Sequence, residues 1–183
     1  MTKLIVRTVP DPVLREKAKP VAAIDARIQQ LMKDMMETMY ADDGIGLAAN
    51  QIGVLERIIV VDVSETRDGS EALLMANPEI LWASEETFTY REGCLSVRPC
   101  STETTADLYA NVTRPRAIRV RYLDQHGVAQ EIEAQELFSQ CIQHEIDHLD
   151  GILFVDHIST LKRGMIMRKI EKLRRVMTDE KPL

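Results

Sequence analysis

The sequence has few cysteines and no long apolar run, and each shortage excludes a class of protein. Its 183 residues contain only three cysteines, Cys94, Cys100 and Cys141. An odd number of cysteines in a chain without a secretory signal argues against a disulfide framework. No apolar run approaches the length of a membrane span, and the first residues lack the apolar core of a signal peptide. We therefore expect a cytoplasmic protein that makes no contact with a membrane.

Positive charge and aromatic side chains are also scarce. The formal net charge is −6 and only 4% of the residues are aromatic. This balance gives no support for direct, sequence-specific binding of nucleic acid. The apolar fraction of 45% and the charged fraction of 28% are ordinary for a globular protein of this length. We expect one domain over residues 1–183, with a core that needs no disulfides.

The periodicity of apolar residues predicts a mixture of helices and short strands. A helix is expected over residues 25–40, where Asp25 is a plausible N-cap and a stripe of methionines faces the core. Residues 10–20 contain three prolines and are expected to form an extended loop. Further helices are predicted over residues 135–150, ending before Gly151, and over residues 159–177. Strands are predicted at residues 57–63, 73–77, 79–83, 117–123 and 128–134. The fold class is therefore α+β, with short mixed or antiparallel strands around a central helix.

The central helix carries the strongest chemical signal, the segment His144-Glu145-Ile146-Asp147-His148. Residues four apart lie on one helix face, so the two imidazoles can bind one metal ion. Glu145 follows the first histidine and can act as general base toward a water molecule. Apolar residues surround the segment, which argues against a merely solvated charged face.

A catalytic site of this kind needs a third protein ligand. In the pattern of the metzincins that ligand would fall on Phe154, which cannot bind metal, and His157 lies three residues too late. A downstream glutamate, as in thermolysin-type enzymes, is poorly represented by Glu171 and Glu180. Cys94, which follows the flexible Gly93, is the best upstream candidate. Two other interpretations stay open: a zinc-dependent endopeptidase, and a closed structural zinc site with Cys141 as a fourth ligand.

Three segments together resemble the signature motifs of the peptide deformylase family, in the same order. They are Gly44-Ile45-Gly46-Leu47-Ala48-Ala49-Asn50-Gln51, Glu92-Gly93-Cys94-Leu95-Ser96 and Gln143-His144-Glu145-Ile146-Asp147-His148. Residues 9–15 are also similar to the start of that family, so the resemblance extends over most of the chain. It implies a hydrolase that removes the N-formyl group from the formylmethionine of nascent polypeptides and releases formate.

The resemblance also implies roles for individual residues. The metal ligands would be Cys94, His144 and His148, with Fe²⁺ as the usual physiological metal and Zn²⁺, Ni²⁺ or Co²⁺ able to replace it. Glu145 would be the general base, and the Gln51 amide and the Leu95 N–H would stabilise the oxyanion. The main chain of Ile45, Gly46 and Gly93 would pair with an extended substrate. The methionine pocket would be lined by Ile45, Tyr90, Leu137 and Cys141, with His144 at its edge.

Two segments depart from the family pattern or from the rest of the chain. After the cysteine motif come Arg98 and Pro99 and a long polar stretch over residues 100–110, expected to be an exposed loop beside the cleft, with Cys100 as a surface thiol. Residues 162–175 hold seven basic side chains against Glu171, a local sum of +6. This helix either presents a solvated basic face over a packed stripe or, as the resemblance implies for bacterial enzymes, contacts the ribosome.

Overall fold

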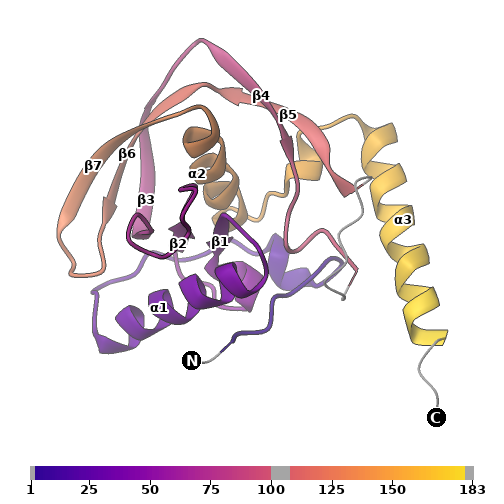
Figure 1. The fold of residues 1–183 in the computed structure, drawn as a ribbon, viewed down its shortest axis with the longest axis horizontal. Coiled ribbons are helices and arrows are strands. Elements are labelled where there is room, and N and C mark those ends of the chain that lie inside the picture. The colour runs from indigo at the N-terminus through magenta and orange to yellow at the C-terminus, as the bar shows by residue number, and fades with distance from the viewer. Residues whose placement is uncertain (1–2, 100–107, 180–183) are drawn as a thin grey trace.

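The chain folds around helix α2, which lies between two antiparallel sheets (Figure 1). The structure, a computed structural model, describes residues 3–99 and 108–179. The described elements are η1 (Pro12–Arg15), α1 (Ala26–Ala41), β1 (Gly46–Ala48), η2 (Ala49–Ile52), β2 (Ile58–Val61), β3 (Leu73–Ala83), β4 (Thr87–Glu92), β5 (Ala110–Pro115), β6 (Ala117–Leu123), β7 (Ala129–Gln135), α2 (Glu136–Leu149), η4 (Phe154–Asp156) and α3 (Thr160–Asp179). The predicted α+β class is confirmed.

The larger sheet has the strand order β1-β2-β3-β6-β7, and β4 pairs with β5 in the smaller one. All pairings between these strands are antiparallel. Helix α2 packs against strands of both sheets, including β1 and β7 of the larger and β4 and β5 of the smaller. Short strand β1 stands at one end of the larger sheet, and no described strand pairs with its other edge. The centre of the molecule is therefore a helix with an unpaired strand edge close beside it.

Helix α1 confirms the interpretation of the methionine stripe as core. Met32, Met35 and Met39 are fully buried in one cluster with residues of β1 and β2. The helix begins where expected, because the Asp25 carboxylate accepts a hydrogen bond from the Ile28 N–H at 2.9 Å and satisfies one of the free amides of the first turn.

Helix α2 lies at the predicted place, from Glu136 to Leu149. Gly151 follows with φ +75°, the left-handed conformation that ends many helices and favours glycine. A β-carbon at this position would lie 2.5 Å from the Arg15 carbonyl oxygen. Glycine is therefore required there both by the backbone angle and by the neighbouring chain.

Two expectations about strands and loops were wrong, and two strands were not predicted. Residues 73–77 and 79–83 form one strand, because β3 continues through Pro78 with only a shift in its register against β6. The irregularity is stabilised by Asn77, whose side-chain amide bonds the Val21 carbonyl and N–H. Residues 10–20 include the 3-10 helix η1, which Asp11 caps. Strands β4 and β5 were not predicted, since β4 is mostly exposed and its sequence lacks a clear apolar alternation.

The predicted exposed loop over residues 100–110 is only partly described. Leu108 is buried and Ala110 already begins β5, so this end is not an exposed loop. The remainder, including Cys100, lies outside the described residues.

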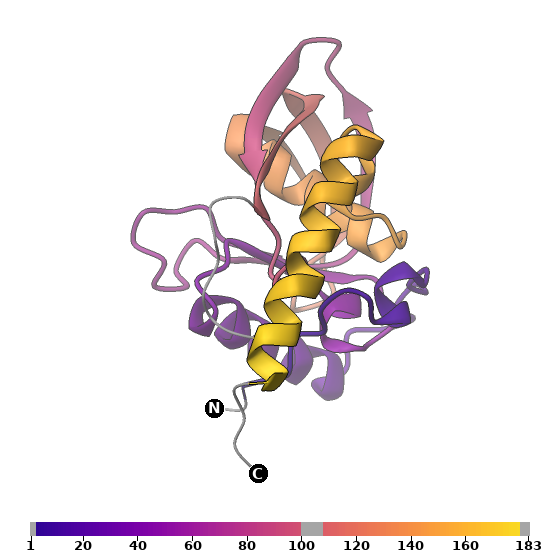
Figure 2. The same ribbon diagram turned by 90° about the vertical axis from the view of Figure 1, so that its right-hand side faces the viewer.

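Helix α3 crosses one side of the molecule (Figure 2) and begins within one residue of its predicted start. Ile166 and Ile170 are buried against a cluster that includes Val97, Leu108 and Phe154. None of the helices in the described part of the chain combines the length and the hydropathy of a membrane span.

Candidate metal centre and substrate cleft

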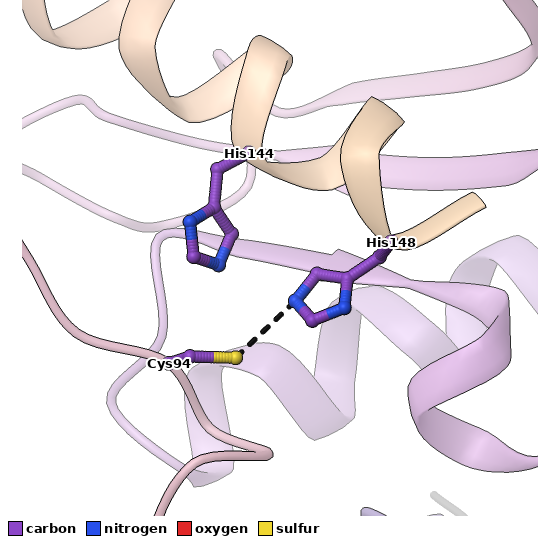
Figure 3. A group of neighbouring side chains, drawn as sticks. All are labelled: Cys94, His144 and His148. Carbon is purple, nitrogen blue, oxygen red and sulfur yellow. Dashed lines mark hydrogen bonds between the residues drawn. The ribbon is translucent and has the colours of Figure 1, made fainter. Parts of the chain in front are cut away.

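His144 and His148 lie one turn apart on α2 and face Cys94, which belongs to the loop after β4 (Figure 3). The Cys94 Sγ is 3.2 Å from the His148 Nε2. One ligand atom from each of the three residues lies within 4.8 Å of the other two. Both histidines are buried and Cys94 is half-buried. Cys94 and His144 line a cleft, so the group is accessible from it.

The three donors fit a single transition-metal ion. One sulfur and two imidazole nitrogens are typical zinc or iron ligands, with bonds of about 2.0–2.3 Å. Three protein donors leave a fourth position for water or substrate, as catalytic sites require. The Ser96 N–H lies 3.3 Å from the Cys94 sulfur and can donate to it, which suits a sulfur that carries negative charge. The set predicted from the sequence is thus brought together in space.

His144 is held in place by Glu92, which the sequence analysis left without a role. The Nδ1 of His144 is 2.8 Å from Glu92 Oε2, so Nε2 is left to face the metal position. Burial alone would raise the pKa of Glu92, but His144 and Arg114 outweigh it and lower the pKa to about 2. Burial likewise opposes a charged His144, yet Cys94 and Glu92 raise its pKa well above the ordinary value. A carboxylate behind a metal-binding histidine fixes the ring and its tautomer.

The Glu92 carboxylate is part of a longer charged network. Arg114 binds both oxygens of Glu92, at 2.7 and 3.1 Å, and donates to Asp147 at 2.6 Å. Asp147 also lies 2.7 Å from His157 Nε2. His157, considered as a metal ligand from the sequence, therefore belongs to this network instead. Glu92 lies two residues before Cys94, in the same motif. Because a metal-binding histidine usually donates its second ring N–H to a carboxylate or a carbonyl, this position could have suggested that Glu92 is the partner of a histidine ligand.

Glu145 lies beside the three ligands and is 4% exposed. Burial is the main reason that its pKa rises to about 7. Its Oε2 atom is buried and has no hydrogen-bond partner among the described residues. The other oxygen lies against Gly46, where any β-carbon would collide with it. A buried carboxylate with a pKa near neutrality and a free oxygen can both accept and return a proton.

Gln51 points its amide nitrogen toward the metal position. Its side-chain oxygen accepts from the Ala48 N–H at 2.8 Å, which leaves the NH₂ group to face the other way. That group lies 3.1 Å from Ser96 Oγ and 3.6 Å from Cys94 Sγ. Leu95 is next to the cysteine in the same loop and lines the same cleft. Both residues predicted as oxyanion donors therefore lie beside the three ligands.

The cleft above the ligands has a volume of about 370 Å³. The residues expected to contact substrate all line it, and they are Ile45, Gly46, Tyr90, Gly93, Leu137 and Cys141. Cys141 is buried, and its thiol donates to the Ile45 carbonyl at 3.4 Å. This contact directs the sulfur to the cleft wall and argues against Cys141 as a fourth ligand.

Comparisons with known proteins agree over most of the chain. A family model described as polypeptide deformylase matches residues 3–164. The peptide deformylase of Methylocella silvestris is 51% identical over 174 residues, which are 93% of this chain and 85% of that protein. The peptide deformylase of Bartonella tribocorum is 50% identical over 167 residues, covering 90% and 89%.

Solved structures give the same result. A crystal structure of a peptide deformylase from Legionella pneumophila is similar with a TM-score of 0.87 at 40% identity, covering 99% of this chain and 100% of that one. A peptide deformylase from Ehrlichia chaffeensis in complex with actinonin has a TM-score of 0.85 at 39% identity, covering 96% and 99%. The similarity includes the elements that carry the three ligands.

Proposed function

This chain belongs to the peptide deformylase family, and from that premise we propose which of its residues perform the reaction. The protein is a hydrolase that removes the N-formyl group from nascent polypeptides. The observation that carries the assignment of roles is the convergence of three metal donors, a buried carboxylate and a directed amide at one cleft. The alternative function, a zinc-dependent endopeptidase, is not favoured.

Cys94, His144 and His148 hold one divalent ion in this proposal. The ion supplies a Lewis acid that polarises the formyl group and makes a water molecule more acidic. We assign Fe²⁺ to the site in the cell, as in the family that the motifs resemble. The donor set itself also suits Zn²⁺, Ni²⁺ or Co²⁺. Metal analysis of protein purified without oxygen tests this assignment: iron at about one ion per chain supports it, and zinc in its place contradicts it.

Glu145 acts as general base and then as general acid. Its pKa of about 7 lets the carboxylate accept a proton from the attacking water near neutral pH. The same group then protonates the amine that departs from the formyl carbon, which gives formate and a free N-terminus. Because the site is buried, the proton stays on Glu145 between the two steps.

Gln51 and Leu95 stabilise the negative charge that develops on the formyl oxygen. The support for Gln51 is the direction of its NH₂ group, which the Ala48 N–H fixes from behind. The support for Leu95 is its position directly after Cys94, which places its backbone N–H in the loop beside the ligands. Donors held in advance cost no reorganisation during the reaction.

The substrate lies along the free edge of β1 in an extended conformation. The main chain of Ile45 and Gly46 on one side, and of Gly93 on the other, pairs with it as a neighbouring strand would. The Ile45 carbonyl takes no part in this pairing, because it already accepts a hydrogen bond from the Asp62 N–H. The methionine side chain enters the pocket lined by Ile45, Tyr90, Leu137 and Cys141, with His144 at its edge. A structure with a bound formyl-methionyl peptide would remove any residue that does not contact the methionine.

The test of the function compares two reactions of one preparation. Protein loaded with Fe²⁺ or Ni²⁺ is given a formyl-Met peptide, and both formate and internal cleavage products are measured. We expect formate with the peptide bonds intact. Internal cleavage without formate would support the endopeptidase instead.

We further propose that the protein works in the cytoplasm and that α3 binds the ribosome. Basic side chains on this helix are exposed, among them Lys162, Arg163, Arg168 and Lys172. Such a surface suits the phosphate backbone of RNA without reading its sequence. Reversing the charge of Arg168 and Lys172 should reduce co-sedimentation with ribosomes and leave peptide hydrolysis unchanged. Unchanged co-sedimentation would contradict the proposal.

A further inference from the structure

The turn between α1 and β1, residues 42–44, is bound by two arginines from different loops. Arg98 comes from the loop that carries the metal ligand Cys94, and its guanidinium donates to the Asp42 carboxylate. Arg67 comes from the loop between β2 and β3 and donates to the Gly44 carbonyl at 2.7 Å.

The contact between Arg98 and Asp42 is one of the most buried ion pairs in the described structure. The side chains are 10% and 6% exposed, and Lys3 adds a second cation to Asp42 at 2.6 Å. The pKa of Asp42 is lowered, because Lys3 and Arg98 outweigh the opposing effect of burial. Both partners line the substrate cleft. A buried pair of this kind holds its two loops at a fixed separation, since opening it leaves an uncompensated charge.

Arg67 is itself held in one orientation. Its guanidinium lies 5.9 Å from the centre of the Tyr40 ring. Its backbone N–H donates to Ser64 Oγ at 3.1 Å, which fixes the main chain from which the side chain extends. The Tyr40 hydroxyl in turn donates to Asp62 at 2.5 Å. A second charge contact of 3.8 Å joins Arg67 to Asp43 in the turn. The loop between β2 and β3 therefore contacts the turn through an arginine side chain that is itself packed against Tyr40.

The turn leads directly into Ile45 and Gly46, the edge that lines the cleft. The Ile45 carbonyl is occupied by the Asp62 N–H at 2.9 Å, so this edge is anchored toward β2 as well. Arg98 thus joins the wall that carries Cys94 to the wall that carries the strand edge. This connection spans the cleft between the two walls.

We infer that Arg98 and Arg67 are positioning residues, which set the β1 edge at the distance from the Cys94 loop needed to pair with a peptide. The inference rests on the proposed function, because it assumes that substrate lies along this edge. Neither arginine is assigned a part in the chemical step.

The test compares two formylated substrates in the variants Arg98→Met and Arg67→Met. A formyl-Met tripeptide can pair with the strand edge, whereas formyl-methioninamide offers only its first residue. We expect the preference for the tripeptide in kcat/KM to fall about tenfold, the effect of losing one or two well-aligned hydrogen bonds. The change should appear in KM, with kcat within about threefold of the wild type and with metal content unchanged.

Two further variants separate positioning from a general loss of structure. Arg98→Lys keeps a cation that can reach Asp42 and should recover most of the tripeptide preference. Arg121→Met removes an exposed pair with Glu79 far from the cleft and should leave the preference as it is. If Arg98→Met does not fold, Arg67→Met and Arg98→Lys decide the question.

The inference is overturned if the folded variants keep the wild-type preference for the tripeptide. It is also overturned if both substrates lose activity equally, or if bound metal falls. Either result would mean that the substitution disturbs the loop that carries Cys94 and not the pairing of the peptide with the β1 edge. Wild-type protein that releases no formate from either substrate would instead refute the proposed function.

Discussion

At the scale of single residues, the surroundings shift the pKa values of two buried glutamates in opposite directions, Glu92 at the end of β4 and Glu145 within α2. Glu92 lies between His144 and Arg114, and despite its burial these cations lower its pKa to about 2. At Glu145 burial outweighs the opposing charges of His144 and Arg114, and the pKa rises to about 7. One carboxylate is thus a permanent anion that orients a ligand, and the other is suited to exchange a proton.

The role of Glu92 predicts a loss of metal affinity on neutralisation. In Glu92→Gln the side chain keeps its size but loses the charge that fixes the His144 ring. Partners of this kind typically contribute about 10–100-fold to metal affinity, so chelator competition should show a dissociation constant raised by that factor. The matched control is Glu79→Gln, an exposed carboxylate far from the site. An unchanged affinity would refute the orienting role.

Gly46 predicts a second effect at this scale. A β-carbon there would collide with a Glu145 oxygen and lie 2.9 Å from the Cys141 sulfur. In Gly46→Ala, Glu145 must move, and displacing a reacting group by about 1 Å can cost on the order of 10²-fold in rate. We expect kcat/KM for a formyl-Met peptide to fall by that factor in folded protein. Activity equal to the wild type would show that Glu145 has room to adjust without loss.

At the scale of elements, the sequence predicted helices and buried strands wherever apolar residues repeat at a regular spacing. The buried methionines of α1 and the apolar positions around His144 in α2 follow the helical repeat closely. Strand β4 could not be predicted in the same way, because it is mostly exposed and has no alternating apolar face. In β5 alternate residues are buried, but one of them is Arg114, so the strand lacks a regular apolar repeat.

The residues of the candidate site also divide into those that the sequence predicts and those that it does not. Cys94, His144 and Glu145 follow from motif spacing and family resemblance, since the chemistry restricts the residue types. Arg114 and Arg98 did not follow, because their roles depend on tertiary contacts with Glu92 and Asp42 across 22 and 56 residues of sequence. Sequence spacing alone does not reveal such contacts.

Helix α3 allows a prediction on its stability. Gly164 lies inside this helix, and an added β-carbon would meet only the end of the Arg168 side chain, at 3.9 Å. Gly164→Ala should therefore raise the free energy of unfolding by about 0.5–1 kcal/mol, through the higher helix propensity of alanine. Urea denaturation measures the change, and formate release should stay the same. A lower stability would mean that α3 needs the flexibility of glycine. This variant is also a suitable control for Gly46→Ala.

At the scale of the whole molecule, the segments around α2 are tied together by charged contacts as well as by core packing. Asp156 accepts hydrogen bonds from Arg15 and from the Leu153 N–H, and it lies 2.9 Å from Arg163. It thereby joins η1, η4 and α3. Burial would raise the pKa of Asp156, but Arg15 and the Leu153 amide outweigh it and the pKa is lowered.

This connection predicts a pH-dependent contribution to stability. A carboxyl group with a lowered pKa stabilises the folded state above its ordinary pKa of about 3.9, and the stabilisation is lost as the pH falls below that value. Asp156→Asn should therefore lower the free energy of unfolding by about 1 kcal/mol at pH 7. The difference from wild type should shrink when urea denaturation is repeated near pH 3. A difference that is equal at both pH values would exclude the charged contacts as its cause.

The most direct test of the account is to measure formate release and bound metal together in Glu145→Ala. The three ligands remain in this variant, so one metal ion per chain should still bind. General acid–base catalysis typically contributes about 10²–10⁴-fold, and formate release should fall by at least the lower factor. Turnover near that of the wild type, in protein with full metal content, would contradict the assignment of Glu145 and with it the proposed mechanism.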